Sequence, residues 1–279
     1  MDAPVVDNEL VIRVSFFVGV FALMAVWELL TPYRILTTSK SGRWLNNLSL
    51  VILNSVLLRV IFPGAAVGMA AIATERQWGL LNNTELPMWP AVIIAVIMLD
   101  FVIYLQHVMF HAIPTLWRLH MVHHTDLDID VTTGNRFHPV EIILSMLIKI
   151  TAITVIGPPV IAVILFEVVL NATSMFNHSN IKMPKRIDRI LRLFIVTPDM
   201  HRVHHSVIKQ ETNSNYGFSL PWWDRLFGTY RHQPSAGHIA MTIGLNQFRN
   251  PALLTLPRLL VLPITGKAGE YPINRSGEK

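Results

Sequence analysis

Long, nearly uncharged stretches are the feature that most restricts how this chain can fold. Residues 10–30 contain two charged side chains, residues 90–113 contain one, and residues 140–173 contain three. Stretches of about 20 apolar residues match the roughly 30 Å thickness of a bilayer's hydrocarbon core. The whole chain is 52% hydrophobic and only 15% charged, whereas soluble domains average about 25% charged residues. We therefore predict an integral membrane protein built from α-helices.

Proline and glycine positions divide these stretches into expected spans. We place spans at about residues 10–30, 45–73 and 90–110, the second interrupted by Pro63-Gly64. Residues 140–174 are too long for one span and short for two, and Gly157-Pro158-Pro159 breaks them near the middle. Because proline removes a backbone donor and clashes with the preceding turn, we expect a helical hairpin there.

The predicted fold class is therefore all-α: a membrane helical bundle of about four spans plus this helical hairpin, with a cytosolic histidine-rich cap. The cap comprises residues 177–279, whose polarity is mixed and which include pieces expected to lie at the membrane interface. The chain shows no internal repeat, and we expect residues 1–279 to form a single domain.

Charged loops indicate an orientation in the membrane. Arg34, Lys40 and Arg43 follow the first span without an acidic residue, whereas the next loop contains Glu75 and Glu85. By the positive-inside rule, the first of these loops is cytoplasmic. The third span then ends on the cytoplasmic side. We expect the membrane to be a bacterial inner membrane, or the ER membrane if the source is eukaryotic. The net charge of +5 is modest and scattered, so nucleic-acid binding is not expected.

Eight of the twelve histidines fall into three tight groups with helical spacing. Residues three and four apart lie on one face of an α-helix, so each group is expected to present its imidazoles as a single patch. Neutral imidazole is a ligand for iron, zinc, copper and nickel, and eight imidazoles exceed what one metal can take. The chain has no cysteine, which excludes thiolate ligands. The groups predict two metal ions and comprise His107 and His111; His120, His123 and His124; and His201, His204 and His205.

The remaining histidines carry weaker signals. His178 lies four residues after Ser174 and seven after Asn171, on one helical stripe, and we expect it to be a ninth ligand. His138, in Arg-Phe-His-Pro, is either a tenth ligand or a structural residue, and we favour the structural role. His232 and His238 lie outside the pattern and are read as ordinary histidines.

Several charged residues near these groups have alternative interpretations. Arg59 lies inside the second span, where we expect it to pair with Asp100, Glu28 or Glu167 rather than to bind substrate. Asp100 either forms that pair or orients a ligand imidazole through its second nitrogen. A solvated acidic loop is the favoured interpretation for most of the remaining acids, which could also hydrogen-bond ligand histidines: Asp126, Asp128, Asp130 and Asp199.

Beyond spacing, the residues around the histidines form longer motifs. They are Gln106–His111, Trp117–His124, Arg136–Glu141 and Asp199–His205, followed by Asn215-Tyr216-Gly217 and Trp223–Thr229. In this order and spacing the chain resembles the fatty acid hydroxylase/sterol desaturase superfamily of membrane di-iron oxygenases. The resemblance covers roughly residues 100–230 and is specific.

This resemblance implies a binuclear iron centre, held by the grouped histidines at the cytosolic ends of a membrane bundle. Such enzymes use O2 and two electrons to attack a C–H bond of a lipid or sterol-like substrate, by hydroxylation or desaturation. The electrons are expected from a separate ferredoxin- or cytochrome b5-like donor, and zinc is an alternative occupant of the purified protein. The chain departs from several members at Ser174, where they have a further histidine.

Other functions fit the sequence less well. The main alternative is a histidine-rich membrane metal-binding or metal-transport protein without oxygenase activity. A transporter needs its ligands near the bilayer midplane, whereas these histidines cluster at the end of one span and in loops. A metallopeptidase of the H-E-x-x-H type needs a glutamate after a histidine, and no histidine here is followed by one.

Overall fold

The structure is a computed structural model that describes residues 8–274, and within them it is helical. Extended backbone pairs in this range only at two isolated bridges, Pro32 with Ile181 and Ser206 with Ile243. The longer helices are α2 (Glu9–Leu30), α3 (Lys40–Ile61), α4 (Ala65–Glu75), α5 (Met88–Ala112), α6 (Pro114–His124), α7 (Pro139–Ile156), α8 (Val160–Asn177) and α14 (Leu256–Thr265). Short helices fill the cap: α9 (Lys185–Leu191), α10 (Pro198–His204), α11 (Lys209–Thr212), α12 (Trp222–Leu226) and α13 (Gly237–Ala240).

Five helical segments are long and apolar enough to cross a membrane, which confirms the predicted all-helical membrane fold. They are α2, the α3–α4 pair, α5, α7 and α8. Gly64, in the left-handed backbone region, starts α4 after the expected break in the second span. The predicted hairpin is α7 and α8, which have 18 residues each. An 18-residue helix is about 27 Å long, so each half matches a span by itself.

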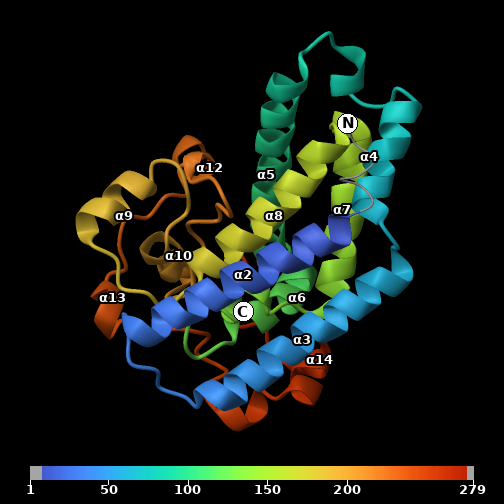
Figure 1. The fold of residues 1–279 in the computed structure, drawn as a ribbon. Helices are drawn as coiled ribbons and strands as arrows, with labels where there is room; N and C mark the ends of the chain where they lie inside the picture. The colour runs from blue at the N-terminus through green and yellow to red at the C-terminus, as the bar shows by residue number, and fades with distance from the viewer. Residues whose placement is uncertain (1–7, 275–279) are drawn as a thin grey trace.

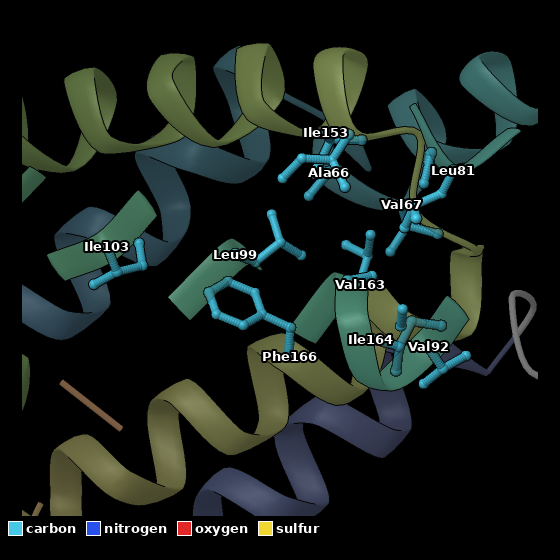
Figure 2. Packing of buried hydrophobic residues seen from close by; sticks show 14 residues of the cluster. Ala66, Val67, Leu81, Val92, Leu99, Ile103, Ile153, Val163, Ile164 and Phe166 are labelled. Atoms are coloured by element: carbon cyan, nitrogen blue, oxygen red, sulfur yellow. The ribbon is translucent and has the colours of Figure 1, made fainter. Parts of the chain in front are cut away.

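A tightly packed apolar core joins four of these helices at the end of the molecule remote from the cap. Leu99 of α5 and Phe166 of α8 lie at its centre, with Ile153 of α7 and Ala66 of α4 beside them (Figure 2). The turn between α7 and α8 lies at this end of the molecule. Its Gly157 has φ +64° and lies against the backbone of Trp78. A Cβ atom on Gly157 would be 2.4 Å from the Trp78 carbonyl oxygen, so this position requires glycine.

The cap helices gather at the other end of the bundle. In Figure 1, α9, α10, α12 and α13 lie on one side of α5 and α8, while α14 lies beneath α6 and α3. α14 is apolar, and its Leu259 packs with Leu50 of α3 and Trp117 of α6 in a second buried cluster. The consecutive helices α5 and α6 are therefore each anchored in an apolar core, α5 in the first and α6 in the second.

Charged residues inside the spans pair differently from the expectation. Arg59 is 58% exposed and lies 3.8 Å from Glu9, so its predicted pairing with Asp100, Glu28 or Glu167 is wrong. Glu167 instead binds Lys149 at 2.8 Å and Arg13 at 3.1 Å. The packing of α2 and α7 against α8 brings these partners together, and such long-range register cannot be read from local sequence.

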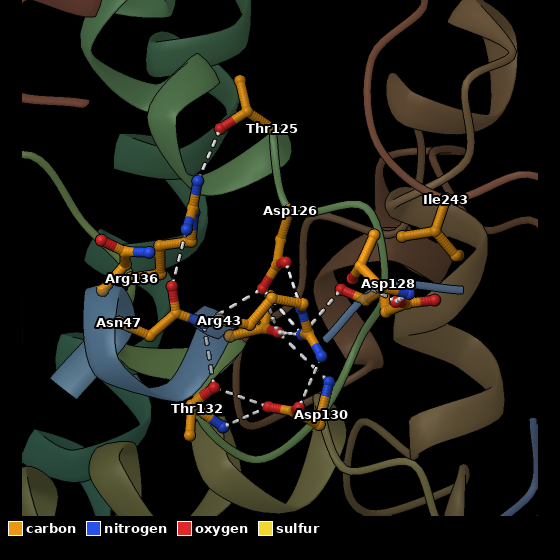
Figure 3. Close-up of polar contacts among 12 residues, drawn as sticks. Arg43, Asn47, Thr125, Asp126, Asp128, Asp130, Thr132, Arg136 and Ile243 are labelled. Carbon is orange, nitrogen blue, oxygen red and sulfur yellow. Dashed lines mark hydrogen bonds and ion pairs between the residues drawn. The ribbon is translucent and has the colours of Figure 1, made fainter. Parts of the chain in front are cut away.

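The acidic segment after α6 is buried, so the predicted solvated loop is wrong. The Arg43 guanidinium of α3 donates from Nε to Asp126 at 2.6 Å and from Nη1 to Asp130 at 2.7 Å (Figure 3). Asn47 bridges Asp126 and Thr132 through its amide nitrogen. Burial alone raises the pKa of the Asp126 carboxyl, but the Arg43 guanidinium holds that pKa below its usual range. Arg43 thus fastens the loop that follows the first histidine triplet.

We expect Arg43→Met to destabilise the protein strongly, because it leaves buried carboxylates without their cation. Removing one partner of a buried ion pair costs about 3–5 kcal/mol. Thermal unfolding of the purified protein in detergent measures the effect. Arg76→Met, at an exposed position beyond α4, is the matched control and should leave the transition temperature nearly unchanged. Equal stability of the two variants would mean that Arg43 does not hold this loop.

The orientation in the membrane can be tested with single cysteines, because the chain has none. Glu85 and Gln210 are exposed, near the turn before α5 and in the cap respectively. If the basic loop is cytoplasmic, an impermeant maleimide should label Glu85→Cys but not Gln210→Cys in sealed cells. Both should react after the membrane is permeabilised. The opposite pattern would reverse the predicted topology.

Candidate metal centre

Nine buried histidines from α5, α6, α8 and α10 converge in two adjacent groups. Within each group, one ring nitrogen of every member lies within 4.8 Å of the others. The first group is His107, His111, His120, His124 and His204; the second is His123, His178, His201 and His205. These are the nine residues that the sequence singles out. Their role as ligands stays a prediction, but the structure brings all of them together.

Each H-x-x-H-H triplet is divided between the two groups. His120 and His124 belong to the first group, whereas His123 belongs to the second. Adjacent helical residues point about 100° apart, while residues four apart differ by only about 40°. The expectation that each triplet forms one patch is therefore wrong. α6 and α10 instead lie between the groups, and each contributes to both.

In the first group, fixed oxygen atoms hold one ring nitrogen of four histidines. Backbone carbonyls and the amide oxygen of Asn213 only accept, so each Nδ1 bound to them carries the proton and the Nε2 of the same ring keeps its lone pair. The Nε2 atoms of all five members are buried and have no partner in the protein, which is the arrangement that a metal ion would satisfy. The Nδ1 contacts are His107 to the Tyr216 carbonyl at 2.8 Å, His111 to Asn213 Oδ1 at 3.0 Å, His120 to Glu141 Oε1 at 2.6 Å and His204 to the Ser214 carbonyl at 2.7 Å.

In the second group, four Nε2 atoms face one another directly. His178 Nε2 lies 3.0 Å from that of His201 and 3.2 Å from those of His123 and His205. Four nitrogens at 2.0–2.1 Å from a shared tetrahedral centre would be about 3.3 Å apart. His178 Nδ1 donates to the Ser174 carbonyl at 2.8 Å, which leaves its Nε2 as the acceptor. The donor set therefore fits a four-coordinate metal ion.

Burial keeps these imidazoles neutral, which is the form that binds metals. Burial lowers the pKa of His120 and of His178 to about 3. Burial, followed by repulsion from neighbouring imidazoles, lowers the pKa of His124 and of His205 well below the usual range. At neutral pH these imidazoles therefore offer nitrogen lone pairs, and no proton has to leave them before a metal binds.

The loop before α12 supplies three of the oxygens that orient the first group. Asn215 lies in this loop with a left-handed φ of 53°, a conformation that asparagine tolerates. Its side-chain amide donates to the carbonyls of Met200 and Arg231. The Asp224 carboxylate accepts the backbone N–H groups of Tyr216 and Gly217, both at 2.8 Å. The Asn-Tyr-Gly and Trp-Asp motifs thus work together to position His107, His111 and His204.

Two acidic residues have roles that sequence reasoning missed or misassigned. Glu141 orients His120, and its place in the motif after His138-Pro139 was the available signal. Asp100 neither pairs with Arg59 nor orients an imidazole as predicted. Its carboxylate accepts from Trp223 Nε1 at 2.9 Å and from the backbone of Ser219 at 3.2 Å. It therefore fastens the cap to α5.

The other singled-out residues lie outside the two groups. His138 accepts from the Val140 backbone at the start of α7, and its Nε2 is 3.0 Å from the Leu260 carbonyl, which fits the favoured structural role. Ser174 Oγ donates to the Gly134 carbonyl at 2.6 Å, so it does not replace a ligand histidine. His232 is exposed. Asp199 pairs with Arg202 at 2.5 Å and lies 4.0 Å from His238, which belongs to neither group.

Comparisons with known proteins identify a family and several relatives with similar sequences. A family model described as fatty acid hydroxylase matches residues 92–229, which include all nine histidines. An ornithine lipid hydroxylase of Rhizobium tropici is 27% identical over 81% of this chain and 70% of that protein.

Two further relatives match smaller parts. The human alkylglycerol monooxygenase is 28% identical over 53% of this chain, which spans only 32% of that protein. Methylsterol monooxygenase 2-2 of Arabidopsis thaliana is 26% identical over 58% of this chain and 61% of that protein. No solved structure matches the chain.

Metal analysis can test the two groups separately. We expect His204→Ala, in the first group, and His123→Ala, in the second, each to lose metal from its own group and to reduce the content below two ions per chain. His232→Ala, at an exposed position, should keep both ions. Elemental analysis of the purified variants gives the counts. Full metal content in His204→Ala would contradict the two-centre interpretation.

Proposed function

Because the chain belongs to the fatty acid hydroxylase superfamily, we propose that it is a membrane di-iron oxygenase. It would catalyse O2-dependent hydroxylation, or desaturation, of a C–H bond in a lipid or sterol-like substrate. The observation that carries this proposal is the pair of adjacent, buried, all-imidazole groups at the ends of apolar helices. The nine histidines would be the metal ligands, within one domain.

The all-imidazole ligand set and the expected oxidation of a C–H bond together support iron as the bound metal. Imidazole suits several transition metals, but zinc is redox-inert and cannot supply oxidation of a C–H bond. When bound, two iron ions would supply O2 activation and electron storage. Zinc in purified protein would then be an inactive replacement.

The protein's own residues would prepare the site for this chemistry. The carbonyls of Ser214 and Tyr216 hold the Nδ1 protons of two ligands, so that the opposite nitrogens face the metal. Glu141 does the same for His120. The ligands are buried, at most 6% exposed, and this excludes bulk water that would otherwise compete for the open coordination positions.

The position of the site fits a lipid substrate. α5 and α8 are apolar for most of their length and bring their histidines to the cap end, so a substrate could arrive from the bilayer while the cap faces water. The matched relatives include an ornithine lipid hydroxylase and an alkylglycerol monooxygenase. We propose a cytoplasmic metal site in a bacterial inner membrane, and a separate ferredoxin- or cytochrome b5-like electron donor.

A metal-binding or transport role explains the structure less well. A transported ion must leave its site, yet two groups of five and four imidazoles enclose their centres with every ligand buried. The groups also lie at the end of the spans, rather than near the midplane where transporters bind. The oxygenase is therefore the better-supported function.

Isotope labelling tests the reaction. Iron-loaded enzyme supplied with reductant, membrane lipid and ¹⁸O2 should place one labelled oxygen atom in the lipid product, detected by mass spectrometry. His204→Ala should give no labelled product. An unlabelled alkene would assign the enzyme to desaturation. Turnover that proceeds equally well without O2 would rule out an oxygenase.

A further inference from the structure

An exposed apolar surface on the cap is not explained by the metal centre. It is formed by the last turn of α9, the residues after it, and α12: Ile190, Leu193, Phe194, Trp222, Leu226 and Phe227. Phe194 is 58% exposed and Leu226 is 70% exposed. We call these six residues the α9–α12 patch. In Figure 1, α9 and α12 lie beside each other, on the same side of α5.

Polar contacts make the patch one rigid surface. Trp222 Nε1 donates to the Leu193 carbonyl at 2.8 Å, and Arg225 donates to the Arg192 carbonyl at 2.7 Å. These bonds attach side chains of α12 to the backbone that follows α9. The two elements are thus attached to each other, while the six apolar side chains of the patch stay exposed.

The patch continues onto a membrane-spanning helix. The Phe227 ring stacks on Phe101 and on Tyr104 of α5, at centroid distances of 5.8 and 5.6 Å. Leu105, the next residue of α5, is 47% exposed. The α9–α12 patch is thus contiguous with an exposed apolar surface of α5, a helix long and apolar enough to cross a membrane.

The charges around the patch are all of one sign. Lys185, Arg186, Arg189 and Arg225 are exposed, whereas the acidic residues of these two helices are buried. Asp188 binds Arg192 and Thr197, and Asp224 binds the backbone of the ligand-orienting loop. An apolar surface with a cationic rim is complementary to the interface of an anionic leaflet.

We propose that the α9–α12 patch is a membrane-interface anchor that inserts into the headgroup region of the same bilayer and requires anionic lipid. Its occupant is the lipid surface, rather than a protein partner. The anchor also bears on the metal centre, because the Asp224 carboxylate of α12 holds the backbone of Tyr216, whose carbonyl orients His107. Seating α12 in the membrane would therefore fix the loop that positions three ligands.

A fluorescent label on Leu226→Cys tests this directly, since the chain has no other cysteine. The full chain is reconstituted in vesicles of phosphatidylcholine, with or without phosphatidylglycerol, containing lipids that carry a nitroxide quencher near the headgroup. We expect strong quenching at position 226 in the anionic vesicles and much less in neutral ones. The same label on Gln210→Cys, an exposed position elsewhere on the cap, should be quenched in neither.

Removing the three cationic residues that α9 contributes to the rim should release the anchor. Each basic residue near an anionic surface contributes about fivefold in binding, so K185Q/R186Q/R189Q should weaken membrane seating of the patch by about a hundredfold. R76Q/K209Q/K267Q removes the same charge elsewhere and should have little effect. Metal content confirms that both variants fold.

Two results would overturn the proposal. One is quenching at position 226 that is equally weak in anionic and neutral vesicles, or is unchanged by removal of the rim. The other is shielding of the label only after a soluble redox protein is added, which would make the patch a protein docking surface instead. The proposed oxygenase reaction is tested by isotope labelling, in a separate experiment. If that reaction failed, the quenching results would still decide whether the patch is a membrane anchor.

Discussion

Nine imidazoles can share one buried space only if they are neutral, because like charges so close together would repel one another. This requirement governs the architecture around the metal centre. For five of the nine imidazoles, the chain provides an oxygen partner for the ring nitrogen that faces away from the centre: backbone carbonyls, one amide oxygen and the carboxyl of Glu141. The acceptors in turn need support, which explains the buried aspartate of α12 and the left-handed Asn215. Much of the cap therefore serves to fix the directions in which the lone pairs of the histidine nitrogens point.

Features that depend on neighbouring residues could be predicted from the sequence. Apolar length gave the spans, and Pro63-Gly64 and Gly157-Pro158 gave the breaks, because proline and glycine act on the local backbone. The order of the spans and the hairpin also predicted that the histidines gather on one side of the membrane bundle. Even the ninth member, His178, followed from its helical stripe alone, and it lies at the centre of the second group.

Features that depend on packing between distant segments could not be predicted. Arg59 and Asp100 are both intramembrane ions, yet one pairs with the first residue of α2 and the other with the cap. The three aspartates after α6 have the composition of a solvated loop, and only the position of Arg43, more than 80 residues earlier, makes them a buried network. The division of each triplet between two groups likewise follows from how α6 and α10 pack, not from their spacing.

That division has a consequence for how the two sites fill. Because α6 and α10 each contribute ligands to both groups, ordering these helices around one ion also places ligands of the other site. The first ion to bind pays the conformational entropy of ordering both helices, and the second meets ligands already in place. Occupancy should accordingly rise as a sigmoidal function of free metal, with singly loaded protein scarce at every concentration. A cell with too little metal would then hold a mixture of fully loaded and empty molecules.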